Sequence, residues 1–263
     1  MTNVVGGEYR VYAIRYATKT FHRSEVFLGY ERYGEPDAEI AMDYFFWVLL
    51  SDRGTVLVDT GFTPSVAERR GHDMLIDPLA ALRSIGVEPS SVSHVVLTHL
   101  HYDHAGNVDA FPEAEIVLQS AEYEFWRAYG GRTQLSWLVE DSDLVAVENA
   151  STEGRLRLLH GDAQILPGVS VILVGGHTPG QQIVLVEGAH PIVFASDALH
   201  YYEELERDRP FDIVTNLEKM YEGYNTLRKL SDRPGTVLVA GHDPRVTSKF
   251  GAGDPGVTIL EIV

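Results

Sequence analysis

The chain contains no cysteine. This absence excludes disulfide bonds, thiolate ligands for zinc, iron–sulfur clusters and a cysteine nucleophile at the same time. A cysteine-free chain is stable in reducing and in oxidising surroundings, so the absence does not identify a cellular compartment.

Positive charge is also scarce, because 21 lysine and arginine residues stand against 38 aspartate and glutamate residues, a formal net charge of −17. A surface this acidic repels phosphate backbones and anionic lipids, which argues against nucleic-acid and membrane partners. No apolar run approaches the roughly 20 residues that a membrane-spanning helix needs. The N-terminal segment lacks the basic and apolar pattern of a secretory signal. We therefore expect a cytoplasmic protein.

The length of 263 residues and the hydrophobic content of 44% are those of an ordinary globular protein. No solenoid period and no low-complexity linker is visible, so we expect a single domain over residues 1–263, with which a homodimer is compatible. The apolar run Tyr44–Ser51 and the segment Thr55–Phe62 predict a hairpin around a tight turn. Residues 131–159 are irregular and predict a loop-rich insertion that ends in the strand Arg155–Leu159.

Four predicted strands end at or near a histidine or an aspartate. They are VVLTH (Val95–His99), VSVILVGGH (Val169–His177), IVFASD (Ile192–Asp197) and TVLVAGH (Thr236–His242). Strand ends present side chains rigidly toward one cleft, which is the usual place for a site in a strand-rich α/β protein. We expect two sheets packed face to face, with helices outside.

The first of these strands leads into the pattern H-x-H-x-D-H, formed by His99, His101, Asp103 and His104. His99 and His101 point the same way in an extended segment and can share one metal, whereas Asp103 and His104 lie beyond a bend and can reach a second. Four such groups without a neutralising cation would be costly in a partly buried turn. Nitrogen and carboxylate ligands without sulfur suit zinc, with manganese, iron or cobalt as alternatives.

The remaining metal ligands must come from distant segments. The candidates at strand ends are His177, Asp197 and His242, of which Asp197 can bridge two cations. A lone histidine is more often structural than a ligand, and on that ground the histidines assigned to structural or surface positions are His22, His72, His94, His160 and His190. Aromatic residues near the expected cleft, most of them expected in the core, are Phe45, Phe46, Trp47, Phe62, Tyr102, Trp126 and Trp137.

The segment THLHYDHAGN, followed in order by GGHTPGQQ, ASD and AGHD and preceded by LVDTGF, resembles the metallo-β-lactamase superfamily. The resemblance implies an αββα sandwich, two mixed β-sheets flanked by helices, with a dinuclear metal centre. It implies that Asp197 bridges the metals and that Asp59 orients a ligand histidine. The implied ligands of the first metal are His99, His101 and His177, and those of the second are Asp103, His104 and His242.

Two divalent cations at such a centre supply a hydroxide nucleophile near neutral pH and stabilise a tetrahedral intermediate. Asp103 is placed to orient the hydroxide and to pass its proton to the leaving group. The expected reaction is therefore hydrolysis of a small-molecule lactone or ester, with two zinc ions per chain.

Within the superfamily the chain is most similar to the N-acyl homoserine lactonase-like group. The lactonases carry a tyrosine three residues after the bridging aspartate that contacts the substrate carbonyl, and His200 occupies that position here. An imidazole can donate the same hydrogen bond, although an exposed residue at the start of a helix is an equally simple interpretation of His200. Two alternatives stay open: hydrolysis of another cyclic ester, cyclic amide or thioester at the same centre, and a metal-binding sensor without turnover.

Overall fold

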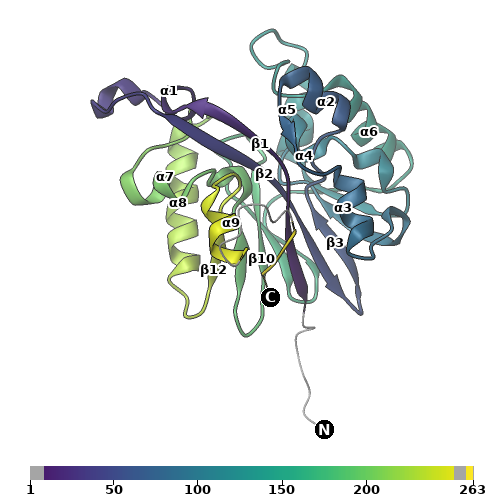
Figure 1. The fold of residues 1–263 in the computed structure, drawn as a ribbon. Helices are drawn as coiled ribbons and strands as arrows, with labels where there is room; N and C mark the ends of the chain where they lie inside the picture. The colour runs from purple at the N-terminus through teal and green to yellow at the C-terminus, as the bar shows by residue number, and fades with distance from the viewer. Residues whose placement is uncertain (1–8, 252–258, 263) are drawn as a thin grey trace.

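The computed structural model describes residues 9–251 and 259–262, so the expected domain of residues 1–263 and the N-terminal segment lie partly outside the described residues. Two β-sheets pack face to face, with helices on their outer sides (Figure 1). This arrangement confirms the predicted α/β sandwich of two mixed sheets. No helix in the described part of the chain is both long enough and apolar enough to cross a membrane.

The larger sheet begins with antiparallel strands and continues with parallel ones. In spatial order its strands are β13 (Ile259–Glu261), β1 (Arg10–His22), β2 (Glu39–Ser51), β3 (Gly54–Val58), β5 (Val92–Val96), β6 (Glu115–Gln119) and β7 (Leu156–Leu159), and β4 (Asp73–Met74) pairs with β1. The antiparallel pair β2–β3 is the hairpin that the sequence predicts.

The smaller sheet is antiparallel except for the parallel pair β11–β12. Its strands, in spatial order, are β12 (Val237–Val239), β11 (Ile192–Phe194), β10 (Gln182–Val186), β9 (Val169–Leu173) and β8 (Ala163–Leu166). Because β11 and β12 run parallel, the segments that follow them leave the sheet at the same edge. Asp197 and His242 are therefore brought to one place.

Short helices connect the strands, and the longer ones cover the sheets. The α-helices are α1 (Arg23–Val26), α2 (Pro64–Arg70), α3 (Pro78–Ser84), α4 (Tyr102–Ala105), α5 (Ser120–Tyr129), α6 (Asp141–Thr152), α7 (Tyr202–Arg207), α8 (Leu217–Ser231) and α9 (Arg245–Phe250). The 3₁₀ helices are η1 (Tyr30–Tyr33), η2 (Pro89–Ser91), η3 (Val108–Ala110) and η4 (Ser196–Ala198). Helix α8 packs against β11 and β12, while α5 and α6 lie on the other side of the molecule against β6 and β7 (Figure 1).

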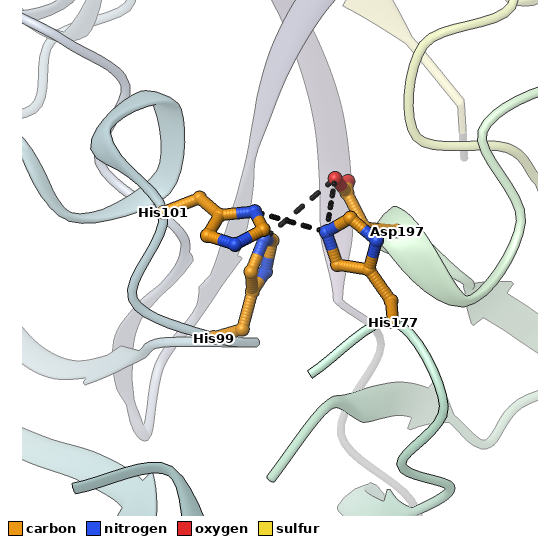
Figure 2. Close-up of side chains that lie close together, drawn as sticks. All are labelled: His99, His101, His177 and Asp197. Carbon is orange, nitrogen blue, oxygen red and sulfur yellow. Dashed lines mark hydrogen bonds and ion pairs between the residues drawn. The ribbon is translucent and has the colours of Figure 1, made fainter. Parts of the chain in front are cut away.

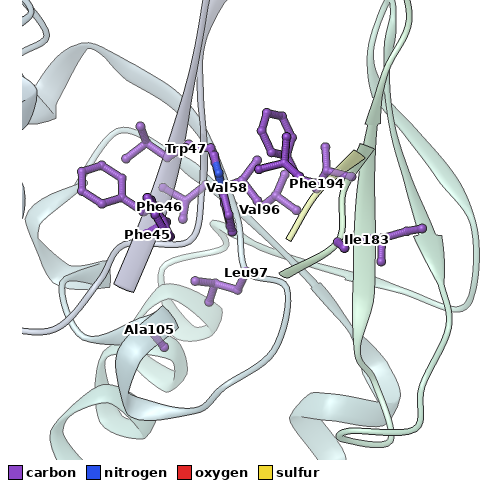
Figure 3. Close-up of a cluster of buried hydrophobic side chains, with 14 of the residues drawn as sticks. Phe45, Phe46, Trp47, Val58, Val96, Leu97, Ala105, Ile183 and Phe194 are labelled. Carbon is purple, nitrogen blue, oxygen red and sulfur yellow. The ribbon is translucent and has the colours of Figure 1, made fainter. Parts of the chain in front are cut away.

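The core fills the space between the two sheets, where side chains from β2, β3 and β5 meet those from β10 and β11 (Figure 3). Trp47 of β2 and Phe194 of β11 are fully buried, and their ring centroids lie 5.3 Å apart. Burying a large apolar side chain contributes roughly 1.5–3 kcal/mol. This packing fixes the two sheets relative to each other and so fixes the strand ends that carry the site.

Helix α6 corrects the prediction of a loop-rich insertion over residues 131–159. The helix Asp141–Thr152 occupies twelve of those residues, and β7 then begins at Leu156. Its sequence, DSDLVAVENAST, places Asp143 on the buried face and leaves Val145 exposed. The apolar stripe that identifies an amphipathic helix is therefore weak, and the period of the sequence did not reveal it.

Candidate metal centre and cavity

The seven predicted ligands lie on four connections at one edge of the sandwich. His99 follows β5, and His101 stands directly before α4, whose first turn contains Asp103 and His104. The other candidates are His177 after β9, Asp197 in η4 after β11, and His242 after β12. All seven side chains are buried, with exposed fractions of 8% or less.

Two close backbone approaches bring the distant segments together. Gly176, next to His177, has a φ of 95°, and a Cβ there would lie 2.6 Å from the backbone of Met220. A Cβ on Gly241, next to His242, would lie 2.6 Å from the carbonyl oxygen of Ser196, the neighbour of Asp197. Only glycine allows these approaches without displacement of the backbone. The two glycines therefore set the positions of the histidines that follow them.

The first group of ligand atoms comes from His99, His101, His177 and Asp197, and these atoms lie within 4.8 Å of one another (Figure 2). Nε2 of His177 lies 2.9 Å from Nδ1 of His101 and 3.3 Å from Oδ2 of Asp197. Nε2 of His99 lies 3.6 Å from the same Oδ2. The grouping agrees with the one implied for a first metal.

The second group consists of Asp103, His104 and His242. Nε2 of His104 lies 3.2 Å from Oδ1 of Asp197, and Nε2 of His242 lies 3.0 Å from that oxygen. Oδ2 of Asp103 lies 3.4 Å from Nε2 of His104. Asp197 thus directs Oδ2 toward the first group and Oδ1 toward the second, as a bridging carboxylate would.

The donor set fits a pair of divalent cations. The Nε2 atoms of His99, His101 and His104 are buried and have no hydrogen-bond partner in residues 9–251 and 259–262. Nε2 of His99 and of His104 lie 3.6 and 3.2 Å from oxygens of Asp197. Buried polar atoms in folded proteins are normally paired, so these orphaned nitrogens indicate that something else satisfies them. Imidazole nitrogen and carboxylate oxygen are ligands for zinc and related cations.

Burial also keeps three histidines of the site in the form that binds metal. It lowers the pKa of His99 and His177 well below the ordinary value and lowers the pKa of His101 to about 4. A neutral imidazole has a free lone pair, whereas an imidazolium has none. These three side chains are therefore ready to act as ligands at neutral pH.

Hydrogen bonds behind the ligands orient the imidazole rings. Asp59 lies 2.7 Å from Nδ1 of His104 and accepts hydrogen bonds from the amide and hydroxyl of Thr98, at 2.7 and 2.8 Å. Nδ1 of His177 lies 2.8 Å from the carbonyl oxygen of Ile213, and Nδ1 of His242 lies 2.8 Å from that of Asp43. With Nδ1 engaged, Nε2 of each ring points into the site. The expected contact between Asp59 and a candidate ligand histidine is present.

Glu122 of α5 is a buried residue of the site that the sequence analysis missed. Oε1 accepts hydrogen bonds from the amide of Leu100 at 3.0 Å and from the indole of Trp126 at 2.7 Å, and Oε2 accepts one from the amide of Gly180 at 2.9 Å. One carboxylate therefore joins the loop of His99 and His101 to the loop of His177. A single glutamate in a short helix gives no sequence signal for this role.

His200 is only 1% exposed, so it is not an exposed residue at the start of a helix. It stacks on Phe211 with ring centroids 3.5 Å apart, and its Nε2 lies 2.9 Å from Oδ2 of Asp197. Its Nδ1 lies 3.6 Å from Glu204. Burial lowers the pKa of His200, but the two carboxylates outweigh burial and raise it to about 9.

A cavity of about 390 Å³ opens beside the metal groups and is lined by five of the seven candidate ligands and by His200. Its lining also includes apolar side chains, namely Val26, Met42, Phe211 and Ile213. Of the aromatic residues expected near the cleft, Tyr102 and Trp137 line the cavity, whereas Phe45, Phe46, Trp47, Phe62 and Trp126 are buried and are not among its lining residues.

His72, one of the histidines assigned to structural or surface positions, lies in the wall of the cavity. It is buried, lines the cavity, and its Nε2 lies 3.0 Å from the hydroxyl of Tyr102. A single histidine after a short helix carries no periodic signal that would have indicated this. His22, His94, His160 and His190 are not among the cavity-lining residues.

Comparison with known proteins adds an independent line of evidence. The model of the metallo-beta-lactamase superfamily matches residues 43–242. An N-acyl homoserine lactonase of Bacillus sp is 25% identical over 79% of this chain and 84% of its own, and the N-acyl homoserine lactonase AttM of Azorhizobium caulinodans is 27% identical over 81% and 86%. The crystal structure of a quorum-quenching N-acyl homoserine lactone lactonase superposes with a TM-score of 0.75 at 22% identity, covering 90% of this chain and 93% of the other.

Proposed function

The chain belongs to the metallo-beta-lactamase superfamily, and from that premise we propose that it is a metal-dependent hydrolase that opens a lactone ring. The observation that carries the proposal is the position of Asp197, whose two oxygens face separate groups of ligands beside an open cavity. Relatives named N-acyl homoserine lactonases match about four-fifths of the chain and support an N-acyl homoserine lactone or a related lactone as substrate.

Zinc is the metal we propose, with two ions per chain and with manganese, iron or cobalt as alternatives. The proposed ligands are His99, His101 and His177 for one ion, Asp103, His104 and His242 for the other, and Asp197 for both. When bound, two divalent cations lower the pKa of a water molecule and polarise a carbonyl oxygen of the substrate.

The residues of the chain carry the rest of the reaction. The carboxylate of Asp103 lines the cavity, and there it orients the attacking water, takes its proton and passes that proton to the alcohol oxygen as the ring C–O bond breaks. The product is a hydroxy acid, and no further reactant is needed.

His200 has a proposed role beside Asp103. The sequence predicts that it donates a hydrogen bond to the substrate carbonyl, and it lines the cavity. Because its Nε2 faces Asp197, we infer that it also holds this carboxylate in place.

A substrate panel tests the proposal. The zinc-loaded chain should hydrolyse lactones with turnover well above that on thioesters, cyclic amides, β-lactams and phosphodiesters, and elemental analysis should give close to two divalent ions per chain. His200→Ala should keep the metal and lower kcat/KM on lactones by about 10- to 100-fold, as expected for one hydrogen bond to a developing charge. Preference for a thioester or a cyclic amide would select that alternative, and bound metal without turnover of any substrate would select the sensor.

A cytoplasmic location and a homodimeric assembly stay predictions from the sequence. Cell fractionation and light scattering of the purified chain measure them directly.

A further inference from the structure

One face of the β1–β2 ribbon forms a wall of the cavity. Lys19 and Phe21 of β1 and Met42 and Tyr44 of β2 are spaced by two residues and all line the cavity. Lys19 pairs with Met42 across the ribbon. The backbone of the next residue, Asp43, holds His242 at two points. Its amide donates to the carbonyl oxygen of His242 at 3.0 Å, and its carbonyl oxygen lies 2.8 Å from Nδ1 of the His242 ring. Lys19 is therefore placed rigidly relative to the second group of candidate ligands.

Within the described part of the chain, the ammonium of Lys19 has one hydrogen-bond acceptor. Nζ donates to the carbonyl oxygen of Arg70 at 2.7 Å, and the group lies 5.2 Å from the ring centroid of Phe21. Among the described residues no carboxylate lies within ion-pair distance of Lys19. Two of its three donor hydrogens remain for another partner.

The other cationic side chains that line the cavity have counter-charges, because His200 faces Asp197 and Glu204 and Arg70 faces Glu140. Arg70 donates to Glu140 at 2.8 Å and to the carbonyl oxygen of Trp137 at 2.7 Å, and its guanidinium lies 3.8 Å from the ring centroid of Tyr102. The acidic residues Glu25 and Asp212 also line the cavity but are exposed. Among the described residues that line the cavity, Lys19 is thus a half-buried cation without a counter-charge, in a chain whose net charge is −17.

We propose that Lys19 binds an anionic group of the substrate, so that the lactone hydrolysed by this chain carries a carboxylate. The inference rests on the proposed function for the ring-opening step. A half-buried ammonium with free donors attracts an anion more strongly than a fully solvated one, because solvent screens it less. A single uncompensated charge matches a monoanion such as a carboxylate.

A purely structural role for Lys19 makes a different prediction. Its bond to the carbonyl of Arg70, the last residue of α2, also stabilises the C-terminal end of that helix. If this were its whole role, loss of the charge would affect charged and neutral substrates equally.

The test compares two γ-butyrolactones that differ only in a ring substituent, a carboxylate in one and a carboxamide in the other. The zinc-loaded full chain should show a kcat/KM for the carboxylate at least ~10-fold above that for the carboxamide. In Lys19→Met the value for the carboxylate should fall by about 10- to 100-fold, chiefly through KM, as expected for one charge-assisted hydrogen bond. The value for the carboxamide should change less than ~3-fold.

Two further variants control for charge and for folding. Lys229→Met removes the same charge from an exposed position of α8 and should leave kcat/KM for both lactones unchanged. Lys19→Arg retains a cation and should retain part of the preference even if Lys19→Met folds poorly. Equal losses on both lactones in Lys19→Met, or no preference in the parent chain, would overturn the proposal.

A binding measurement separates this inference from the proposed function. The lactam analogues, 2-pyrrolidone-5-carboxylate and its carboxamide, are titrated calorimetrically into the parent chain and Lys19→Met. Binding of the carboxylate that depends on Lys19, without turnover of any lactone, would reject the lactonase and keep the anion site. Carboxylate binding that does not depend on Lys19 would reject the anion site whatever the activity.

Discussion

Asp103 is the most exposed of the seven candidate ligands, at 8%, and it lines the cavity. His104 and His242 lie around its carboxylate, and together they lower its pKa even though burial acts in the opposite direction. A carboxylate that stays ionised and faces the substrate can accept a proton from water. At the scale of single residues, the proposed function gives Asp103 both a metal-binding role and an acid–base role.

Asp103→Asn separates these two functions. The amide oxygen can still contact a cation but cannot accept a proton, so kcat on the best lactone should fall by at least ~10²-fold while metal content changes little. Elemental analysis and steady-state kinetics measure the two effects. Asp109→Asn makes the same substitution at an exposed residue six positions later and should leave kcat unchanged. A parental kcat in Asp103→Asn would refute the proton-transfer role, and loss of metal together with activity would leave Asp103 a ligand only.

The sequence predicted that the seven candidate ligands lie together, because they follow strands. His99 and His101 are two residues apart, and Asp197 and His242 each end an apolar run, so pattern and spacing were sufficient to find them. Lys19, His72 and Glu122 were not found because their roles depend on contacts with distant segments, such as Arg70, Tyr102 and Gly180. No local period encodes such contacts.

At the scale of elements, the sequence period also failed to predict α6. This helix contains a buried acidic residue. Asp143 lies in its first turn and is buried, and one of its carboxylate oxygens has no hydrogen-bond partner among the residues that the structure describes. Burial, together with Glu140 and Asp109, raises the pKa of Asp143 to about 7. The helix is therefore destabilised by its own side chain when that side chain ionises.

Asp143→Asn should stabilise the protein in a pH-dependent way. The folded pKa lies above the unfolded value, so the unfolded state loses its proton first, and stability falls as pH rises from about 4 to about 7. Above that range the loss in free energy of unfolding is constant, at up to about 4 kcal/mol. Denaturant unfolding should show a higher free energy of unfolding for Asp143→Asn than for the parent chain at pH 8, and little difference at pH 4. Asp141→Asn, at an exposed position two residues earlier, should show no such gain, and an equal gain at both pH values would contradict the assignment.

At the scale of the whole molecule, the site joins the two sheets through charge. Its ligands come from four connections, one on the larger sheet and three on the smaller, and two of the seven are carboxylates in a chain that already carries a net charge of −17. Two cations would offset four negative charges. The metals would therefore act as cross-links between the halves of the sandwich as well as parts of the catalytic centre.

Removing the metals should then destabilise the entire fold. A cation that binds only the folded chain stabilises it by mass action, about 4 kcal/mol at a thousand times its Kd, so a chelator should lower Tm by roughly 10 °C. Calorimetry in the presence and absence of chelator measures this shift, and added zinc should restore the original Tm. His177→Ala removes a ligand contributed by the smaller sheet and should reduce the effect of the chelator. If elemental analysis shows that metal has left while the melting curve is unchanged, the seven side chains do not connect the two sheets through metal, and hydrogen bonds such as those of Glu122 and Asp59 are sufficient to hold the site together.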